Sequence, residues 1–557
     1  MTNPSPSPQD NRNLLIAVLV CALVFVGFDY FRLQGANDRA EIQQAVQAQQ
    51  EIAPGEVVSP GAPKLEGSGI VPASANALRA DERELVDIRS ANLEGRLALR
   101  GGRIDRLFLP HYDQTLDGAN PVQIFNPSGE KVFFYEAGWL AENLKTPDGN
   151  TLWQAEQTKL TKDQPLTISW QSPEGLLFQR QYILNPENYT ITVIDGVSNQ
   201  SEKPVSLVHY AQIHKGMTQK ILKEVQSQST FTRFVGPEGY LAGEHRAFGY
   251  DTLMEDGPQS LTTRQGWAGI STPYFLGSLV PEQHEMDKKI TFRHSNVRGK
   301  DFFSVDVQSL PLIIQPGGYS ERSYQVFAGP KRIELLERQG AKLEQAVDFG
   351  WYHIIAKFFF DLVMWFYGLI GNLGVAVIMV TLLIKIALWP LSAKSYVAMS
   401  RMKQLQPKMM QLKEKHGDDR QTMSMEMMAL YRQHKVNPMS GCWPIMIQIP
   451  IFFAFYKMIL ISFEFRHEPF MLWIQDLSAR DPYFVLPVIM GLTMLIQQKL
   501  NPAPADPVQA KVMKILPIMF TVIFALFPAG LVLYWTTNSI LSVAQQWFVM
   551  RKLGIKS

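Results

Sequence analysis

The chain has 557 residues, of which 46% are hydrophobic, and its 53 basic and 51 acidic side chains nearly balance. A general nucleic-acid surface would show a strong basic excess, so we expect no DNA partner. The two cysteines, Cys21 and Cys442, lie in or beside hydrophobic runs, which excludes a disulfide framework. Of the 23 methionines, 19 follow residue 345, together with most of the long hydrophobic runs. The chain therefore divides into a soluble part and a membrane part.

The N-terminal region predicts a membrane anchor. Residues 14–28 form an uninterrupted hydrophobic run. A cleaved signal peptide is the alternative, but the run ends without a small-x-small cleavage site. Tyr30 and Phe31 extend the run toward the length of a membrane span. We therefore expect a cytosolic N-terminus at 1–13 and an uncleaved transmembrane helix at 14–31.

Residues 32–85 are rich in Ala, Gln, Pro, Gly and Glu and show little periodicity, which is typical of a flexible linker. From 86 to 345 the pattern changes to short strand-like runs separated by turns. Residues 189–194 alternate polar and apolar side chains before a turn at Asp195-Gly196, and similar runs lie at 131–135, 166–170 and 302–307. Many short strands with such turns predict a large antiparallel β-sandwich at 86–345.

The remaining sequence predicts helices. Residues 346–370 are mostly hydrophobic and aromatic, with His353, Lys357 and Asp361 spaced every four residues. This narrow polar stripe fits an amphipathic helix in the membrane interface, and a transmembrane span is the alternative. Hydrophobic runs further along predict five more spans. They lie at about 373–391, 442–461, 483–498, 514–527 and 530–549.

The charges of the connecting loops set the orientation. The loop at 392–441 carries nine Lys or Arg residues against four acids, whereas 463–482 carries two against four. The positive-inside rule therefore places 392–441 in the cytosol. Counting back through the spans puts 32–371 on the outside, so we predict six transmembrane helices with both termini in the cytosol.

Several catalytic signatures are missing from this sequence. It contains no phosphate-binding loop of the G-x-x-x-x-G-K-[ST] type, no H-E-x-x-H zinc helix and no G-x-S-x-G nucleophile turn. A nucleotide-driven pump and a standard hydrolase are therefore poorly supported. We expect no cofactor, no metal and no classical enzymatic activity.

A charged residue lies within the predicted span at 373–391. Lys385 in such a position costs ~2.5–3.5 kcal/mol on insertion scales, so it usually faces protein or water. Snorkelling toward the cytosol is the alternative. The predicted orientation places further polar residues in the half of the membrane next to the cytosol, and these are Thr381, Gln448, Gln497, Asn538, Ser542 and Gln545. Their shared depth predicts a polar groove open to the cytosol, although hydrogen bonding between helices would explain each residue separately.

Such a groove would attract an acidic side chain arriving from the cytosol. At an effective dielectric near 20 and a separation of ~4 Å, the attraction to a lysine is ~4 kcal/mol, which is of the same order as the cost of carrying one charge into the membrane. The groove is therefore expected to draw a polar N-terminal tail part-way across. The apolar segment of the client would meanwhile slide into the lipid.

The loop at 392–441 reads as a helical hairpin, roughly 394–415 and 420–435. It holds nine methionines, and flexible thioether side chains suit promiscuous apolar surfaces. Packing within the hairpin is the alternative. The composition therefore predicts an adaptable surface for polypeptides.

Short motifs across the C-terminal region carry a family resemblance. In order, they include Gly371-Asn372, Trp389-Pro390-Leu391, Gly417-Asp418-Asp419, Met427-Met428-Ala429-Leu430-Tyr431, Gly441-Cys442-Trp443-Pro444, Gln448-Ile449-Pro450, Trp473-Ile474-Gln475-Asp476-Leu477-Ser478, Asp481-Pro482-Tyr483 and Phe527-Pro528-Ala529-Gly530-Leu531. With these motifs, the segment from about 350 to 557 resembles the YidC family of membrane protein insertases, which is related to the Oxa-type insertases. The remainder resembles the Gram-negative form, with an extra first span and a large periplasmic domain.

The resemblance implies a bacterial inner-membrane protein with a five-helix core and a cytosol-open groove holding one essential positive charge. That charge falls on Lys385, where many members have arginine. Implied client contacts are Ile449, Pro450, Tyr534 and Trp535, and the hairpin residues that match are Asp418, Asp419, Met427 and Met428. Implied partners are nascent membrane proteins, the lipid bilayer, the Sec translocon, the ribosome and the signal-recognition system. The periplasmic domain is implied to be a mutarotase-like supersandwich without the sugar activity.

Two other classes of function compete with an insertase and chaperone. A membrane-tethered protein that binds or modifies carbohydrate would act through residues 86–345, with His209 and His214 as candidates, although lone histidines in a sandwich are usually structural. A proton-coupled transporter would need polar residues that continue into the outer half of the membrane. The sequence shows none there.

Overall fold

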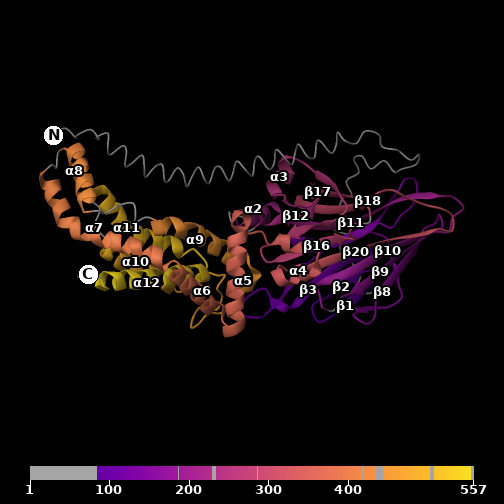
Figure 1. Cartoon of the computed structure of the whole chain (residues 1–557). Helices are drawn as coiled ribbons and strands as arrows, with labels where there is room; N and C mark the ends of the chain where they lie inside the picture. Colours follow the sequence, from indigo (N-terminus) through magenta and orange to yellow (C-terminus); the bar gives the residue numbers. More distant parts are fainter. Residues whose placement is uncertain are drawn as a thin grey trace. The chain divides into compact units, whose positions relative to one another are not determined.

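The computed structural model describes residues 84–185, 187–228, 234–284, 286–415, 419–434, 443–501 and 507–552. The described residues form two compact units (Figure 1). The sandwich unit comprises 84–348 with 461–463, and the helical unit comprises 349–460 with 464–552. The predicted anchor at 14–31, nearly all of the predicted linker, and Asp418 lie outside the described residues.

Within the described residues, the sandwich unit contains an 11-stranded sheet and a nine-stranded sheet. The first has the order β14-β17-β18-β11-β5-β3-β2-β1-β7, with β19 paired to β11 and β4 to β3, and the second has the order β13-β12-β15-β16-β20-β10-β9-β8-β6. Pairing is antiparallel except between β1 and β7. The strands are β1 (Leu85–Arg89), β2 (Glu94–Ala98), β3 (Arg103–Asp113), β4 (Pro121–Phe125), β5 (Lys131–Ala141), β6 (Gln154–Ala155), β7 (Lys159–Thr161), β8 (Leu166–Gln171), β9 (Leu176–Leu184), β10 (Thr190–Asn199), β11 (Val205–Thr218), β12 (Gly236–Leu241), β13 (Glu244–Ala247), β14 (Gln259–Thr263), β15 (Gly266–Ser271), β16 (Phe275–Pro281), β17 (Lys288–Val297), β18 (Lys300–Ser309), β19 (Leu312–Ile314) and β20 (Tyr319–Pro330).

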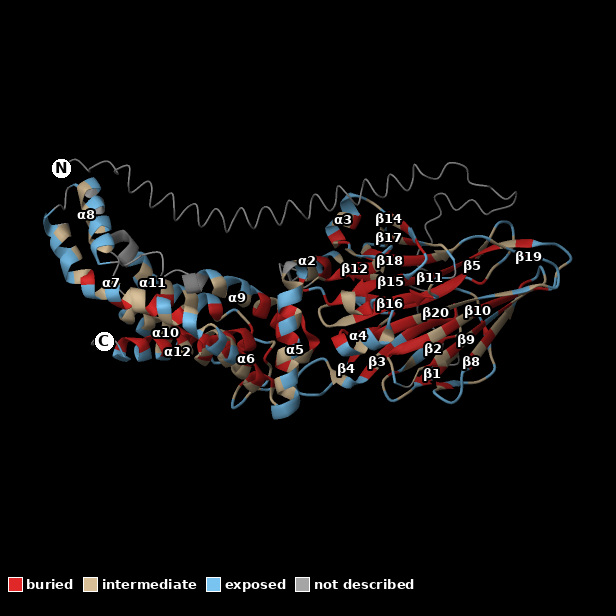
Figure 2. Cartoon of the chain, in the orientation of Figure 1, coloured by how far each residue is buried: buried red, intermediate tan, exposed pale blue. Residues whose placement is uncertain are grey.

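The four strand-like runs of the sequence lie in β5, β8, β10 and β18, which confirms them as strands. Strand β10 shows why the pattern works. Ile191, Val193 and Val197 share one face of the strand and are fully buried, because side chains two residues apart point to the same side of a sheet. Figure 2 shows that buried residues fill the strands of both sheets. The sandwich unit also contains α2 (Gln219–Gln228), α3 (Tyr250–Glu255), α4 (Ile333–Gln339) and η2 (Leu343–Ala346).

The helical unit contains the predicted hydrophobic helices. Its elements are η3 (Gly350–Tyr352), α5 (His353–Ile370), α6 (Leu373–Ala387), α7 (Trp389–Lys415), α8 (Arg420–Gln433), α9 (Trp443–Ile461), α10 (Val485–Leu500), α11 (Pro507–Phe524) and α12 (Ala529–Lys552), with η5 (Phe463–Phe465) after α9. Helix α6 begins at its N-cap Asn372, whose Oδ1 accepts a hydrogen bond from the Val375 backbone N–H at 2.9 Å.

The helix in the predicted span at 373–391 ends earlier than the hydrophobic run. Helix α6 ends at Ala387, and α7 begins at Trp389 with a bend of 67° between the two helices. Pro390 lies in the first turn of α7, where its missing N–H is tolerated. Hydrophobicity continues across this bend, so the sequence pattern alone does not reveal it.

Within the part of the chain that the structure describes, helix length and composition alone do not confirm the predicted number of spans. Among the described residues, α5 is the one helix long and apolar enough to cross a membrane, and α6 with most of α7 qualifies if the bent pair counts as one span. The apolar helices Met446–Ile461 and Val485–Leu500 are shorter. The six spans and the cytosolic termini therefore stay predictions, as does the interfacial placement of α5.

Candidate functional site

Lys385 points into the helical unit and is only 6% exposed. Its Nζ donates a hydrogen bond to Ser542 Oγ of α12 at 2.7 Å, and that hydroxyl donates to the Asn538 backbone carbonyl at 2.8 Å. Gln545 Nε2 donates to the Lys385 backbone carbonyl at 3.3 Å. The lysine thus joins α6 to α12, which is the opposite of a snorkelling side chain that extends away from its bundle.

Helix α9 also contacts α12, through the side chain of Gln448. Its Nε2 donates to Asn538 Oδ1 at 2.8 Å and approaches the Tyr534 hydroxyl at 3.3 Å. Tyr534 is buried and stacks on Phe455 of α9 with ring centroids 4.3 Å apart. Polar side chains therefore follow α12 in a line from Tyr534 through Asn538 to Ser542. We call this line, together with Lys385, Gln448 and Gln545, the polar seam.

The polar seam has an unused hydrogen-bonding group. Gln545 is 7% exposed, and its Oε1 has no hydrogen-bond partner among the described residues. Buried side-chain oxygens without a partner are rare in proteins, and such atoms often meet a water molecule or a ligand. The seam can therefore accept a further polar group close to Lys385.

Two predicted groove residues do not join the polar seam. Thr381 is buried, but its hydroxyl donates to the Val377 carbonyl of its own helix at 2.7 Å. Gln497 of α10 is half-buried, and its side chain has no hydrogen-bond partner within the described part of the chain. A similar predicted depth in the membrane is therefore not enough to show that two side chains belong to the same site.

One contact of the polar seam was missed by sequence reasoning. Tyr396 of α7 is buried and hydrogen-bonds with Ser542. Its position was assigned to the cytosolic hairpin because α6 was expected to continue to residue 391. The signal available in the sequence was an aromatic side chain, Tyr396, six residues after Pro390.

The four predicted client contacts differ in exposure. Ile449 and Pro450 lie exposed on α9. Tyr534 is buried in the polar seam, and Trp535 is half-buried against the rings of Phe452 at 4.8 Å and Phe524 at 5.4 Å. The first pair is therefore accessible at the surface of α9, whereas the second pair packs against aromatic rings of neighbouring helices, and the client contacts stay a prediction.

The hairpin residues divide between capping and surface roles. Asp419 Oδ1 accepts hydrogen bonds from the backbone N–H groups of Gln421 and Thr422, both at 3.1 Å, and so caps α8. Met427 is half-buried, whereas Met428 is 52% exposed. Met410 and Met425 are also exposed, so this hairpin presents thioether side chains on its surface.

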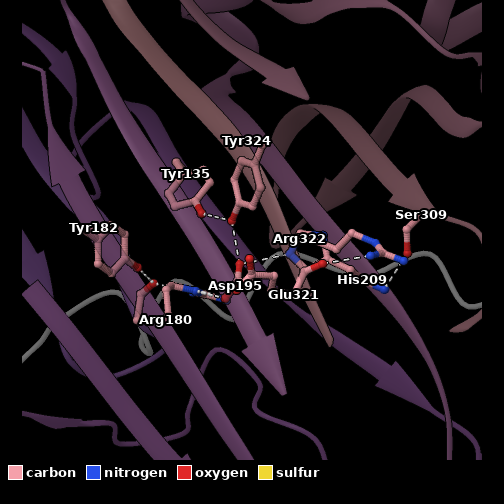
Figure 3. Close-up of polar contacts among 10 residues, drawn as sticks. Tyr135, Arg180, Tyr182, Asp195, His209, Ser309, Glu321, Arg322 and Tyr324 are labelled. Carbon is pink, nitrogen blue, oxygen red and sulfur yellow. Dashed lines mark hydrogen bonds and ion pairs between the residues drawn. The ribbon is translucent and has the colours of Figure 1, made fainter. Parts of the chain in front are cut away.

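The sandwich unit holds a separate buried polar network (Figure 3). The Asp195 carboxylate accepts hydrogen bonds from Arg180 Nε at 2.5 Å, from the Tyr324 hydroxyl at 2.8 Å and from His209 Nε2 at 3.0 Å. Tyr324 also hydrogen-bonds with Tyr135. His209 and Tyr135 belong to the 11-stranded sheet and the other three residues to the nine-stranded sheet, so the network ties the two sheets together.

Charge and burial act against each other in this network. Burial alone would raise the pKa of Asp195, but the Arg180 charge and the bond to His209 lower it to about 2. Burial lowers the pKa of His209, although Asp195 opposes this shift. Asp195 is therefore ionised and His209 neutral at neutral pH, which fits an internal ion pair with Arg180.

The two histidines proposed for carbohydrate chemistry have structural partners. His214 is fully buried, and both ring nitrogens are occupied: Nδ1 lies 2.6 Å from Ser304 Oγ, and Nε2 lies 3.0 Å from Glu136 Oε1. His209 is 5% exposed and bound to Asp195. The described residues include no cluster of three or more His, Cys, Asp or Glu side chains suited to a metal ion. These contacts favour a structural role for both histidines.

Comparison with protein families assigns both parts of the chain. The model of the YidC periplasmic domain matches residues 85–362, and that of the 60Kd inner membrane protein matches 365–556. The membrane protein insertase YidC of Magnetococcus marinus is 36% identical over 567 residues, which cover 98% of this chain and 99% of the relative. That of Rhizobium meliloti is 34% identical, covering 98% and 97%. The chain belongs to the YidC family of membrane protein insertases.

Membership confirms the family resemblance and the expectation of an insertase rather than an enzyme. It also supports a membrane protein with a β-rich periplasmic domain. Among solved structures, an active YidC insertase aligns with a TM-score of 0.37 and 18% identity, covering 84% of this chain and 92% of that one. A galactose mutarotase-like protein from Lactobacillus casei aligns with a TM-score of 0.30 and 11% identity, covering 44% and 99%. Overlaps this loose carry no conclusion about the site.

Proposed function

We propose that this insertase receives the transmembrane segments of its clients from the cytosol at the polar seam and releases them into the lipid. The observation that carries the proposal is the contact of Lys385 Nζ with Ser542 Oγ, which holds a cation between α6 and α12. Among the described residues, the side chains that contact Lys385 and line the polar seam carry hydroxyl and amide groups. A client's acidic side chain would provide the missing counter-charge.

The charge balance around Lys385 supports this role. Within the described residues, the side-chain partner of Lys385 is a neutral hydroxyl, and the lysine forms no ion pair. A buried charge without a counter-ion is costly, and this cost favours a partner that brings the opposite charge. At an effective dielectric near 20, a carboxylate at ~4 Å gains ~4 kcal/mol. An acidic N-terminal tail would therefore be held long enough for the adjacent apolar segment to enter the lipid.

The proposed orientation has six spans, at 14–31 and along α6, α9, α10, α11 and α12, with both termini in the cytosol of a bacterium and the sandwich unit in the periplasm. The polar seam then lies in the half of the membrane next to the cytosol. Residues nearer the opposite ends of α6 and α12, such as Val377 and Val532, are apolar and fully buried. This apolar packing supports a groove that is closed on the side away from the cytosol, and in our proposal it opens toward the cytosol when a client binds.

The partners we propose follow from the cytosolic surfaces. The excess of basic residues at 392–441 and the exposed methionines of α7 and α8 suit contacts with a ribosome, with the signal-recognition system and with nascent chains. Small clients would need this protein alone. Larger clients would be handed between it and the Sec translocon.

Insertion into liposomes that hold only this protein, without nucleotide, tests the proposal. The client is a small membrane protein with an acidic N-terminal tail, and the variants are Lys385→Arg, Lys385→Met and Lys385→Glu. We expect insertion with wild type and Lys385→Arg, and loss with the other two. Lys357→Glu is the matched control, because this lysine pairs with Asp361 on α5, outside the polar seam. Equal insertion by all Lys385 variants would overturn the proposal.

A further inference from the structure

The connection between α9 and α10 fastens several helices of the helical unit at one end. In this connection, which we call the outer loop (464–484), the Phe470 carbonyl accepts a hydrogen bond from Asn372 Nδ2 at the start of α6, at 2.7 Å. The Leu477 carbonyl accepts from the Gly530 N–H of α12 at 2.9 Å, and Glu468 hydrogen-bonds with Tyr367 of α5. The outer loop thus holds the starts of α6 and α12 and the end of α5.

The loop is anchored to the next helix by one carboxylate. Asp481 is 1% exposed, and its Oδ1 accepts hydrogen bonds from Trp473 Nε1 at 3.0 Å and from the Tyr483 N–H at 3.1 Å. Its Oδ2 accepts from the Leu486 N–H in the first turn of α10, at 2.8 Å. A carboxylate at a helix N-terminus is stabilised by the helix dipole as well as by these bonds.

The loop packs closely where it meets α6. A Cβ atom added at Gly374 would lie 2.2 Å from Cδ2 of the Phe470 ring, so the glycine is needed for this approach. On α12, the Ala529 N–H donates to the Ala479 carbonyl at 2.6 Å. The same two helices carry Lys385, near the end of α6, and Ser542, in the second half of α12. The outer loop therefore fixes the starts of α6 and α12, whereas Lys385 and Ser542 lie further along these helices.

We propose that Asp481 is a positioning residue for insertion. By fastening the outer loop to α10, it keeps the ends of α6, α10 and α12 together, so that the groove stays closed on the periplasmic side while a client is handled near the cytosol. This inference rests on the orientation and the groove proposed above. It predicts that loss of the carboxylate opens a path from the periplasmic side into the bundle.

Cysteine labelling in the full-length protein tests this role. Cys21 and Cys442 are replaced by serine, and a membrane-impermeant maleimide is added to the periplasmic side of right-side-out vesicles. Val377→Cys places a thiol at a fully buried position of α6, and Gln475→Cys places one at an exposed position of the outer loop. The first reports opening of the bundle, and the second reports the side on which the loop lies.

We expect Asp481→Ala to speed labelling of Val377→Cys by about tenfold or more, which corresponds to about 1.4 kcal/mol in the closed-to-open balance. Asp481→Asn keeps one acceptor oxygen and should lie between wild type and Asp481→Ala. The matched control is Asp476→Ala in the same loop, because that side chain accepts one hydrogen bond, from the Ser478 N–H at 2.8 Å, and contacts no helix through it. In Asp476→Ala, Val377→Cys should be labelled at the wild-type rate.

The outcomes separate this inference from the proposed function. If Gln475→Cys is labelled but Val377→Cys stays unlabelled in folded Asp481→Ala and Asp481→Asn proteins, Asp481 does not close the bundle and the inference is wrong. If Gln475→Cys is labelled only from the cytosolic side, the proposed orientation is wrong, and the assignment of a periplasmic seal is overturned with it. A thermal unfolding curve of each variant shows whether it is folded.

Discussion

The Lys385 ammonium and the Ser542 hydroxyl lie 2.7 Å apart on two different helices, and both residues are buried. A hydroxyl satisfies one donor of the ammonium without neutralising it. The site therefore keeps its positive charge, whereas a carboxylate at the same place would cancel it. A cation without a counter-ion can bind an acidic group of a client, whereas a cation already paired with a carboxylate would only join two helices.

Replacing this hydroxyl with an internal counter-ion should inactivate the site. We expect Ser542→Asp to abolish insertion of a client with an acidic tail, because the new carboxylate competes for Lys385 with an attraction of ~4 kcal/mol. Ser542→Thr keeps the hydroxyl and should retain most activity. The measurement is the inserted fraction in liposomes. Wild-type insertion by Ser542→Asp would show that the free charge of Lys385 is not needed.

The buried network of the sandwich unit should dominate the stability of that unit. Asp195→Ala leaves Arg180 charged and buried, and removal of one partner from a buried pair costs about 3–5 kcal/mol. The Arg264–Asp287 pair is the control, because both side chains are exposed and Asp287→Ala should cost less than about 1 kcal/mol. Denaturant unfolding of the full chain, followed by tryptophan fluorescence, compares the two. Similar losses for both variants would contradict the role assigned to the network.

Much of this fold could be predicted from local sequence patterns. Alternation identified β10, hydrophobic runs located α6, α9, α10, α11 and α12, and the four-residue spacing of Asn538 and Ser542 placed both on one helix face. An ionisable residue in a hydrophobic run singled out Lys385. Each of these signals lies within one short stretch of sequence, so it can be recognised without knowing which distant segments pack against it.

The unpredicted features depend on contacts between distant segments. The bend after Ala387 lies within continuous hydrophobic sequence, and it brings Tyr396 to Ser542. The Thr381 hydroxyl bonds to its own helix, which depth in a predicted membrane does not reveal. Asp481 lies in a polar loop, and only the folded chain shows that its carboxylate is buried and caps α10.

Two histidines of the sandwich unit should give pH effects of opposite sign. Burial lowers the pKa of His209, so the unfolded chain takes up a proton there more readily, and stability falls as pH drops below about 6.5. For His245, burial lowers the pKa, but the hydrogen bond and the charge of Glu238 outweigh burial, so the pKa is raised. Its contribution is therefore present below about pH 6.5 and is lost as pH rises through the folded-state pKa.

Denaturant unfolding of the full chain between pH 5 and pH 8 checks both signs. Relative to wild type, His209→Gln should lose less stability on acidification, and His245→Gln should lose more. Asp195 adds a further loss of stability below about pH 4, as its carboxylate with a pKa of about 2 becomes protonated. Equal pH profiles for the two histidine variants would show that neither residue is linked to folding in this way.

The contact between Gly374 and Phe470 predicts a steric effect on the helical unit. In Gly374→Ala the new methyl group meets Cδ2, Cγ and Cβ of Phe470 at 2.2, 2.7 and 3.0 Å, so the whole ring must shift rather than its tip. Overpacking of this kind costs about 1–3 kcal/mol. Gly368→Ala is the control, since a Cβ there meets nothing within 4 Å and alanine favours a helix by about 1 kcal/mol over glycine. Thermal unfolding in detergent should therefore show a lower midpoint for Gly374→Ala and an unchanged or higher one for Gly368→Ala, and equal midpoints would mean that the outer loop does not press on α6.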